Sequence, residues 1–477
     1  MLDLIVRGGE VVRPEGAGRF DLGVREGRIA VVAAAGSLEA EAEREVDARG
    51  LVVLPGGIEP HAHLGEIVPA AWAGARDVYT QGPRAASRAA LFGGTTTIID
   101  FATAPGRSEG LPPTTINEDV ERRRAAFAGQ CYTDYAFHYV LRGEVGAERL
   151  SQVAEAVAQG NASFKVFMTF PRLRVPDGYL AAAFEAVGRA GGMMVVHGEN
   201  DEVVRAMTER LKREGRDQAS NLHLVHNNLS EALAFQTATR IASHHGAGVY
   251  FVHTTAKEGV AVIAEARAAG QPVYGEALHN YLEFTAADYA KPAGMLVHTY
   301  PALKGEADRE ALVEGLLDGR LSTVGTDEYT TSRQVKLHGT TIETAAGGHN
   351  GIETRLAVAW TKFVAERGMS LEWFAGIVSS NAARILGLYP RKGAIAVGSD
   401  ADLVLMDPAL QRMITVAGLH AETDYSIWDG FACNGYPVMT ILRGRVVVEN
   451  GTLRGDPSDG EWLGRKVAPE ILAGPAV

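Results

Sequence analysis

Residues 59–64 read EPHAHL, and His61 and His63 in this stretch stand just beyond a short apolar run. Two residues that are two positions apart on an extended chain project from the same face, so both imidazoles can bind one cation. A strand that ends in polar ligands points them out of the core, and several parallel strands bring such ends to one face. The stretch therefore predicts a barrel of parallel strands with a metal site at its mouth.

Four further residues that can bind a metal occupy the same kind of position. They are Lys165 in SFKVF, His197 in VVHGEN, His253 in YFVHTT and Asp327 in VGTD. Each alone has an ordinary explanation, because a lysine on a strand usually forms an ion pair, a histidine packs in the core, and an aspartate caps a helix or loop. Even the His-x-His pair arises by chance in many sequences. The placement of all six at the ends of apolar runs predicts a single site.

The composition favours small-molecule chemistry over nucleic-acid or membrane binding. The 477 residues, 46% of them hydrophobic, exceed one ordinary domain and predict a large domain with a smaller one. The net charge is -12, and no basic stripe is available to replace the counterions of phosphate groups. The chain has two cysteines, no signal-like start and no apolar run of about 18 residues, so we expect a cytoplasmic protein.

Both ends of the chain predict short β-strands. The expected strands are residues 4–6, 11–12, 22–24 and 29–32 near the start, and 394–397, 401–405, 438–442 and 446–448 near the end. We expect residues 1–55 and 391–477 to form one small β-sandwich domain. The last part, from about residue 451, is expected to be an extended arm that is suited to exchange between subunits.

Residues 56–390 alternate strand-like runs with helical stretches closed by glycine, which is typical of βα units around a parallel sheet. Helices expected at 257–268 and 308–317 stop before Gly270 and Gly319. Eight candidate strands end near His63, Asp100, His138, Lys165, His197, His253, Glu276 and Asp327. Because eight strands close a (β/α)8 barrel, the predicted fold class is α/β, a TIM-like barrel that carries the metal site.

Four histidines, one lysine and one aspartate suit two divalent cations, provided that the lysine carries no positive charge. Reaction of the Lys165 amine with CO2 removes this charge, and the carbamate has two oxygens that can bridge metals roughly 3.5 to 4 Å apart. Two divalent ions bring four positive charges, against three negative charges from the carbamate, Asp327 and a bridging hydroxide. Imidazole and carboxylate ligands favour zinc, with manganese or cobalt as alternatives.

Such a site predicts a hydrolase. Two cations lower the pKa of a bridging water towards neutrality and polarise a carbonyl oxygen of the substrate. Asp327, at the end of the last strand, is placed to accept the proton of the attacking hydroxide and to pass it to the leaving nitrogen.

At these residues the chain resembles the cyclic amidohydrolase family, the dihydropyrimidinase and hydantoinase group of the amidohydrolase superfamily. The resemblance runs over nearly the whole length and includes residues 92–96 (FGGTT), 275–276 (GE), 350–355 (NGIETR), 381–383 (NAA), 388–393 (LYPRKG) and 398–402 (GSDAD). It implies an enzyme that opens a dihydropyrimidine or a 5-substituted hydantoin, small cyclic amides. It also implies a homo-oligomer, commonly a tetramer in the family.

Position by position, the resemblance implies a more buried metal held by His61, His63, Lys165 and Asp327, and a second one held by His197, His253 and the shared carbamate on Lys165. Asn350 and Tyr300 match positions where the family holds the cyclic amide through backbone groups. Phe170 stands where the family often has a tyrosine whose hydroxyl steadies the oxyanion. Because losing one such donor typically costs about 10² to 10³ in rate, Tyr300, Tyr329 and His279 are candidates to replace it.

Two other departures from the family bear on the substrate. Glu328 stands where a histidine commonly follows the catalytic aspartate, and its charge is expected to disfavour substrates with a nearby carboxylate. Gly65 stands where dihydroorotase-like relatives carry an arginine that grips a carboxylate, which argues against a dihydroorotase.

Other functions stay open at this point. The same site serves allantoin or another cyclic imide or lactam, and the dihydropyrimidinase-related cytoskeletal proteins keep the fold as scaffolds without catalysis. The presence of all six predicted ligands argues against the scaffold. Phosphotriesterase-like chemistry uses a similar metal set, but the β-rich ends and residues 350–351 fit it poorly.

Overall fold

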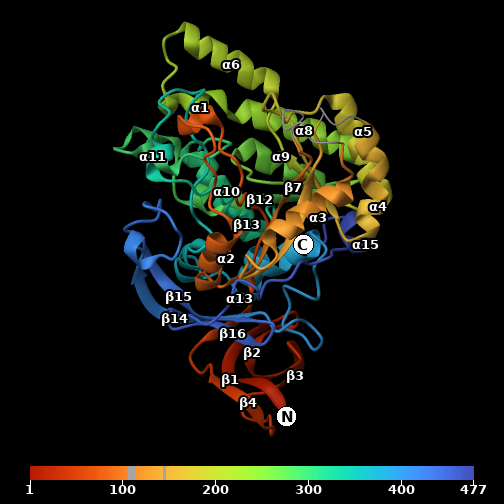
Figure 1. Ribbon diagram of the computed structural model, residues 1–477, viewed down its shortest axis with the longest axis vertical. Helices are drawn as coiled ribbons and strands as arrows, with labels where there is room; N and C mark the ends of the chain where they lie inside the picture. The colour runs from red at the N-terminus through yellow and green to blue at the C-terminus, as the bar shows by residue number, and fades with distance from the viewer. Residues whose placement is uncertain (106–112, 143–146) are drawn as a thin grey trace.

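The computed structural model describes residues 1–105, 113–142 and 147–477. Its centre is an eight-stranded sheet in which each strand pairs in parallel with the next along the chain (Figure 1). The sheet curls into a nearly closed barrel, which confirms the predicted fold class. The strands are β6 (Gly57–Glu59), β7 (Thr95–Thr103), β8 (Asp134–Val140), β9 (Ser163–Phe167), β10 (Met193–His197), β11 (Gly248–Phe251), β12 (Val273–Leu278) and β13 (Thr323–Gly325).

Helices join the strands and cover the outside of the barrel. They are α2 (Pro83–Phe92), α3 (Ile116–Phe127), α4 (Val153–Ala158), α5 (Asp177–Ala190), α6 (Asp201–Arg213), α7 (Leu222–Val225), α8 (Asn228–His245), α9 (Lys257–Ala268) and α10 (Glu306–Asp318). The two helices expected from the sequence are present as α9 and α10. Local sequence sets their ends, because Thr115 and Glu118 form a capping box at the start of α3, and α10 ends at Gly319 with φ +83°.

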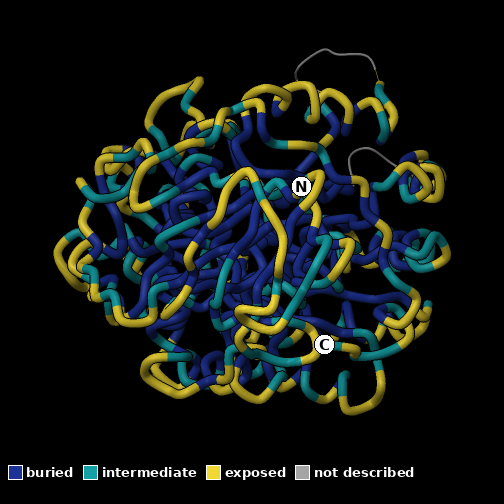
Figure 2. The backbone as a smooth tube through the Cα atoms, turned by 90° about the horizontal axis from the view of Figure 1, so that it is seen from below, coloured by how far each residue is buried: buried dark blue, intermediate teal, exposed yellow. Residues whose placement is uncertain are grey.

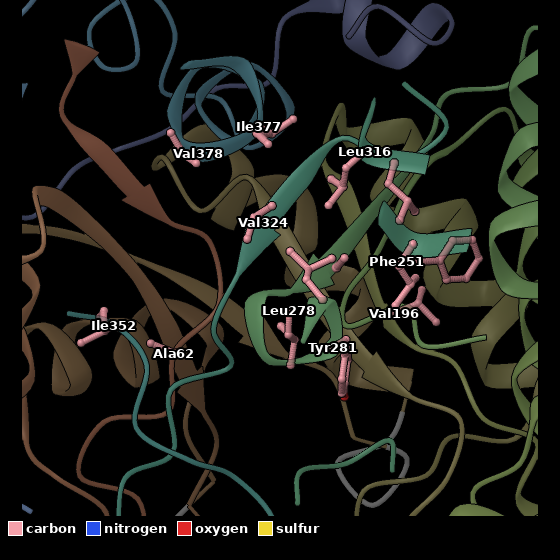
Figure 3. Packing of buried hydrophobic residues seen from close by; sticks show 14 of the residues in the cluster. Ala62, Val196, Phe251, Leu278, Tyr281, Leu316, Val324, Ile352, Ile377 and Val378 are labelled. Atoms are coloured by element: carbon pink, nitrogen blue, oxygen red, sulfur yellow. The ribbon is translucent and has the colours of Figure 1, made fainter. Parts of the chain in front are cut away.

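Buried residues fill the interior of the molecule, and exposed residues follow its outer loops (Figure 2). After β13 the chain adds short helices, α11 (Arg333–Lys336), α12 (Arg355–Ala359), α13 (Leu371–Ala375) and α14 (Asn381–Ile385). Figure 3 shows Val324 of β13 beside Ile377 and Val378, which precede α14. The buried guanidinium of Arg355 donates to the carbonyl oxygens of Val324 and Val378, at 2.9 and 3.1 Å, and so ties the last strand to these helices.

Both ends of the chain join in a second, mixed sheet at one end of the long axis of the molecule (Figure 1). Strand β5 pairs antiparallel with β14 and so links the N-terminal strands to the C-terminal ones. Hydrogen bonds connect all nine strands in one sheet. The strands are β1 (Leu2–Arg13), β2 (Gly16–Arg25), β3 (Arg28–Ala34), β4 (Ala42–Asp47), β5 (Val52–Pro55), β14 (Leu403–Met413), β15 (Ala432–Leu442), β16 (Arg445–Glu449) and β17 (Thr452–Leu453). The division of the chain after residues 55 and 390 stays a prediction.

Residues 394–397 do not form the expected strand. Ile395 is buried in the core of the mixed sheet, but the chain turns at Gly398, where φ is +94°. The turn places the N–H of Gly398 2.8 Å from the carbonyl of Ile29, and the N–H of Ile29 2.9 Å from the carbonyl of Ser399. Ile395 therefore fills the core without entering a ladder, and Val397 at the turn is exposed.

The C-terminal segment is not an arm that extends from the molecule, because it packs on the chain's own barrel. Leu463, Val467 and Ile471, the last in α15 (Pro469–Ala473), are buried against residues from the N-terminal ends of the barrel strands. The hydroxyl of Tyr274 donates to the carbonyl of Ile471 at 2.8 Å. The segment therefore closes the barrel end that lies away from the predicted site. Among the described residues, no helix combines the length and apolar character needed to cross a membrane.

Candidate metal centre

The six predicted metal ligands lie at the carboxyl ends of five barrel strands. They are His61 and His63 after β6, Lys165 in β9, His197 at the end of β10, His253 after β11 and Asp327 after β13. Five are buried, and the side chain of His63 is 16% exposed. This is the end of a (β/α)8 barrel at which active sites are found.

His61, His63 and Asp327 form the tightest part of the cluster. Oδ1 of Asp327 lies 3.2 Å from Nε2 of His61 and 3.2 Å from Nε2 of His63. One ligand atom from each residue lies within 4.8 Å of the others, so the three can bind a single ion. Nε2 of His61 is buried and makes no hydrogen bond to any described residue. A buried nitrogen in that state calls for a partner, and a cation supplies one.

Lys165 faces the same point. Its Nζ is fully buried, has no hydrogen-bond partner among the described residues, and lies 5.3 Å from the ring centre of Phe101. The same ring stacks on His63 with centres 4.5 Å apart. Burial lowers the pKa of Lys165 to about 7, against the attraction of Asp327 and Glu276. A large fraction of the amine is therefore uncharged near neutral pH, and the uncharged amine is the nucleophilic form.

His197 and His253 lie beside this group. Their ring centres are 4.4 Å apart, and the ring centre of His253 is 5.3 Å from that of His61. Burial lowers the pKa values of His197 and His253, the latter well below its usual value. Both imidazoles are thus neutral, the form in which histidine binds a metal.

The protonation of His63 differs from that of the other histidines. Burial disfavours a charge on this imidazole, but Glu66 and Asp327 together raise its pKa to about 10. A cation that binds at His63 must therefore displace a proton, which makes its binding weaker as the pH falls.

Three glutamates, none of which was predicted to have a role, bind three of these histidines. A carboxylate on one nitrogen of an imidazole fixes the tautomer and aims the other nitrogen at the site. The pairs are Glu276 with Nδ1 of His61 at 3.1 Å, Glu66 with Nδ1 of His63 at 3.1 Å, and Glu199 with Nε2 of His197 at 2.8 Å. Glu66 and Glu199 follow their histidines by three and two residues, a signal that was readable, whereas Glu276 comes from another strand.

Three residues of the site have positive φ angles. These are Phe170 at +70°, His253 at +41° and Asp327 at +51°. A non-glycine residue in this region costs on the order of 1–3 kcal/mol, and such strain gathers at functional sites. The rest of the fold therefore holds these three residues in a backbone conformation that is locally unfavourable.

The predicted substrate-binding residues divide into two kinds. Phe170 and Tyr300 line the mouth together, since the ring centre of Phe170 is 5.0 Å from that of His197 and 5.7 Å from that of Tyr300. The Asn350 side chain is buried and donates from Nδ2 to the carbonyl of Tyr425 at 2.5 Å. The Asn350 side chain thus binds the backbone of Tyr425, so only the backbone groups of Asn350 itself are left for a substrate.

Of the candidates to replace the absent tyrosine hydroxyl, two are engaged elsewhere. The hydroxyl of Tyr300 donates to the carbonyl of Ala345 at 3.2 Å, and Nε2 of His279 accepts from Nε1 of Trp428 at 2.8 Å. Tyr329 lies nearest the cluster, with its ring centre 6.1 Å from that of His63.

Glu328, whose charge was predicted to disfavour substrates with a nearby carboxylate, is bound to the protein's own backbone, and its effect on the substrate stays a prediction. This carboxylate is fully buried, and Oε2 accepts hydrogen bonds from the backbone N–H groups of Gly351 and Ile352 at 2.7 and 2.8 Å. Its other oxygen accepts from the hydroxyl of Thr330. Glu328 therefore positions the segment that carries Asn350, and its place in the sequence next to Asp327 concealed this role.

The chain is similar to known proteins over nearly its whole length. Residues 52–447 match the Amidohydrolase family. The D-hydantoinase of Geobacillus stearothermophilus is 31% identical over 475 residues, which cover 98% of each chain. The dihydropyrimidinase of Rattus norvegicus is 33% identical over 483 residues, which cover 98% of this chain and 90% of the relative.

Solved structures agree with this similarity. A crystal structure of D-hydantoinase superposes with a TM-score of 0.90 at 30% identity, covering 99% of this chain and 100% of the other. The L-hydantoinase (dihydropyrimidinase) of Arthrobacter aurescens superposes with a TM-score of 0.84 at 27% identity, covering 98% and 100%.

Proposed function

Because the chain belongs to the amidohydrolase family, within its dihydropyrimidinase and hydantoinase group, we propose that it opens cyclic amides, a dihydropyrimidine or a 5-substituted hydantoin, at the candidate metal centre. The observation that carries the proposal is the cluster of His61, His63 and Asp327 beside the buried amine of Lys165. Such a donor set suits a metal-dependent hydrolase and has no purpose in a scaffold.

The side chains fit two divalent cations. His61, His63 and Asp327 are within reach of one ion, and His197 and His253 form a second group of donors. We assign a carbamate on Lys165 as the ligand shared by both, because the buried Nζ lacks a partner among the described residues and a bare ammonium would repel the cations. When bound, zinc, manganese or cobalt ions lower the pKa of water and polarise a carbonyl oxygen.

Asp327 is the proposed acid and base. Burial alone would raise the pKa of Asp327, but the adjacent imidazoles of His61 and His63 hold it well below its usual value. The carboxylate is therefore ionised and ready to accept a proton from the attacking water. Its side chain is 11% exposed, so it keeps contact with the mouth, where it can return the proton to the leaving nitrogen of the amide.

Aromatic side chains line the mouth and exclude water from the ring of a bound substrate. Tyr300 stacks on Trp72 of α1 (Ala70–Ala73) with ring centres 5.4 Å apart, and Tyr329 meets Trp72 edge-on at 6.2 Å. These faces suit a flat cyclic amide and an apolar substituent on it. We further propose a homotetramer, on the family resemblance alone, which analytical ultracentrifugation tests.

The experiment is a ring-opening assay of metal-replete protein on hydantoin, a 5-substituted hydantoin and dihydrouracil. We expect turnover of at least one of these rings. Lys165→Ala is expected to lose activity and bound metal together, because the shared ligand is gone. The matched control is Lys212→Ala, since Lys212 pairs with Glu343 at 3.2 Å on the surface and should keep full activity. A metal-replete wild type that opens none of the rings would contradict the proposal.

A further inference from the structure

A histidine outside the proposed metal ligands is joined to them by one carboxylate. His226 follows α7, is 5% exposed, and places Nδ1 2.9 Å from Oε1 of Glu199. The other oxygen of Glu199 lies 2.8 Å from Nε2 of His197. Glu199 is itself 1% exposed, so this buried carboxylate contacts one imidazole with each of its two oxygens.

This contact decides which nitrogen of His226 carries its hydrogen. A carboxylate only accepts hydrogen bonds, so each imidazole must donate an N–H to Glu199. The second nitrogen of a neutral imidazole then carries a lone pair. For His226 this atom is Nε2, which makes no hydrogen bond to a described residue and is not closed off by protein atoms.

The imidazole of His226 lies at the mouth of the candidate metal centre. The ring centre of His226 is 4.8 Å from that of Tyr300 and 6.4 Å from that of Phe170. The Phe170 ring has no polar atom, and the Tyr300 hydroxyl already donates to Ala345. His226 therefore adds an uncommitted hydrogen-bond acceptor to a wall that is otherwise aromatic.

Hydantoins and dihydropyrimidines present two ring N–H groups. The nitrogen of the amide that breaks must face Asp327, which returns a proton to it. The second N–H enters an aromatic mouth, where a donor without an acceptor is costly. We propose that Nε2 of His226 accepts a hydrogen bond from this second N–H, so that His226 selects rings that carry it. The inference rests on the proposed function and deepens it.

The test compares hydantoin with 1-methylhydantoin, in which a methyl group replaces the second N–H. Wild-type enzyme is expected to favour hydantoin by about tenfold or more in kcat/KM, the size of one hydrogen bond. Two variants remove the acceptor in different ways. His226→Arg keeps a hydrogen-bond donor for Glu199 but has no acceptor. His226→Phe keeps a ring of similar size that has neither a donor nor an acceptor.

Both variants are expected to lose most of the preference, mainly through a higher KM for hydantoin, because the contact is made in the bound ground state as well. The matched control is His223→Arg in α7, the short helix that His226 follows, since Nδ1 of His223 faces the carbonyl of Ser220 at 3.0 Å. It should keep the wild-type ratio.

A role through Glu199 alone gives a different pattern, in which His226→Arg retains the wild-type ratio while His226→Phe loses bound metal. That pattern would overturn the inference, as would an unchanged ratio in either active variant. Should one variant fail to fold, the ratio in the other decides. A wild type that opens none of hydantoin, the 5-substituted hydantoin and dihydrouracil refutes the proposed function instead, so the two failures are distinguishable. If the wild type opens only dihydrouracil, the same comparison is made between dihydrouracil and 1-methyldihydrouracil.

Discussion

Phe170 stands where the family resemblance implies a tyrosine. Its ring lies beside His197, 5.0 Å between centres, on backbone that is already held at φ +70°. Phe170→Tyr adds one hydroxyl at the mouth without changing that backbone. If a donor at this place stabilises the developing oxyanion, turnover of hydantoin or dihydrouracil should rise, by up to about 10²-fold. An unchanged kcat would mean that this hydroxyl does not limit the enzyme.

Lys165 gives a pH dependence to the assembly of the centre. Its pKa of about 7 means that the reactive, uncharged fraction of the amine increases by about tenfold between pH values near 6 and near 8. The sign follows from the lowered pKa, because deprotonation precedes reaction with CO2. Metal-free enzyme equilibrated with the same partial pressure of CO2 at both pH values and then mixed with zinc should therefore regain activity faster at the higher pH, because dissolved CO2 is equal and only the uncharged fraction of the amine differs. A rate that is equal at both pH values, or greater at the lower one, would argue against a carbamate.

For single residues, the sequence indicates which side chains gather at the site better than it indicates which hydrogen bonds position them. His61, His63, Lys165, His197 and Asp327 were visible because each follows an apolar run. The hydrogen bonds that Glu276 accepts from His61, and that Glu328 accepts from the backbone N–H of Gly351, depend on strands and loops that meet only in the fold. Adjacency to Asp327 in sequence did not reveal that Glu328 accepts hydrogen bonds from the backbone of Gly351 and Ile352.

Among the elements, the two expected helices are present as α9 and α10, because glycine marks their ends. Helix α5 provides a matched pair of glycines with no other atom within 4 Å of an added Cβ, so packing does not enter the comparison. Gly191 caps the helix at φ +74°, whereas Gly178 lies in its first turn without positive φ.

Alanine at these two positions should act in opposite directions. Gly191→Ala forces a Cβ into the left-handed region and is expected to reduce the free energy of unfolding by about 1 kcal/mol. Gly178→Ala is expected to raise it by about 0.5 to 1 kcal/mol, since it lowers the entropy of the unfolded chain. Urea denaturation of the two variants measures both changes. Equal signs would contradict the assigned conformation of Gly191.

Strands at the chain ends were less predictable. Residues 394–397 are all apolar and were expected to form a strand, yet they lie outside any strand, because a loop can place one residue, here Ile395, in a core as well as a ladder can. Strands β4 and β5 were missed: β4 is largely exposed and polar, and β5 is only four residues long. A short run of apolar residues does not by itself show whether the segment forms a strand, as β5 does, or a loop, as residues 394–397 do.

For the whole molecule, the sequence predicted that both ends belong together beside a barrel, and the pairing of β5 with β14 shows how they meet. It did not predict that the last residues close the barrel from the other side. That contact joins Leu463 to Tyr135 through a backbone hydrogen bond of 2.8 Å, and the two lie more than three hundred residues apart in sequence. No local pattern encodes such a contact.

The closing segment should contribute to the stability of the barrel. Leu463 is fully buried in the cluster at the N-terminal ends of the strands. Leu463→Ala is therefore expected to reduce the free energy of unfolding by about 2 to 5 kcal/mol through lost contacts and a cavity. The control is Val397→Ala, since Val397 is 68% exposed and should change stability little. A Leu463 variant as stable as this control would place the segment away from the barrel.

The central claim, two cations joined by a carbamate on Lys165, has one direct measurement: anomalous diffraction from crystals of the protein loaded with zinc. The account predicts two anomalous peaks, one among His61, His63 and Asp327 and one beside His197 and His253, with density that continues from Nζ of Lys165 towards both. A bare lysine amine, or peaks absent from these positions in fully loaded crystals, would contradict it.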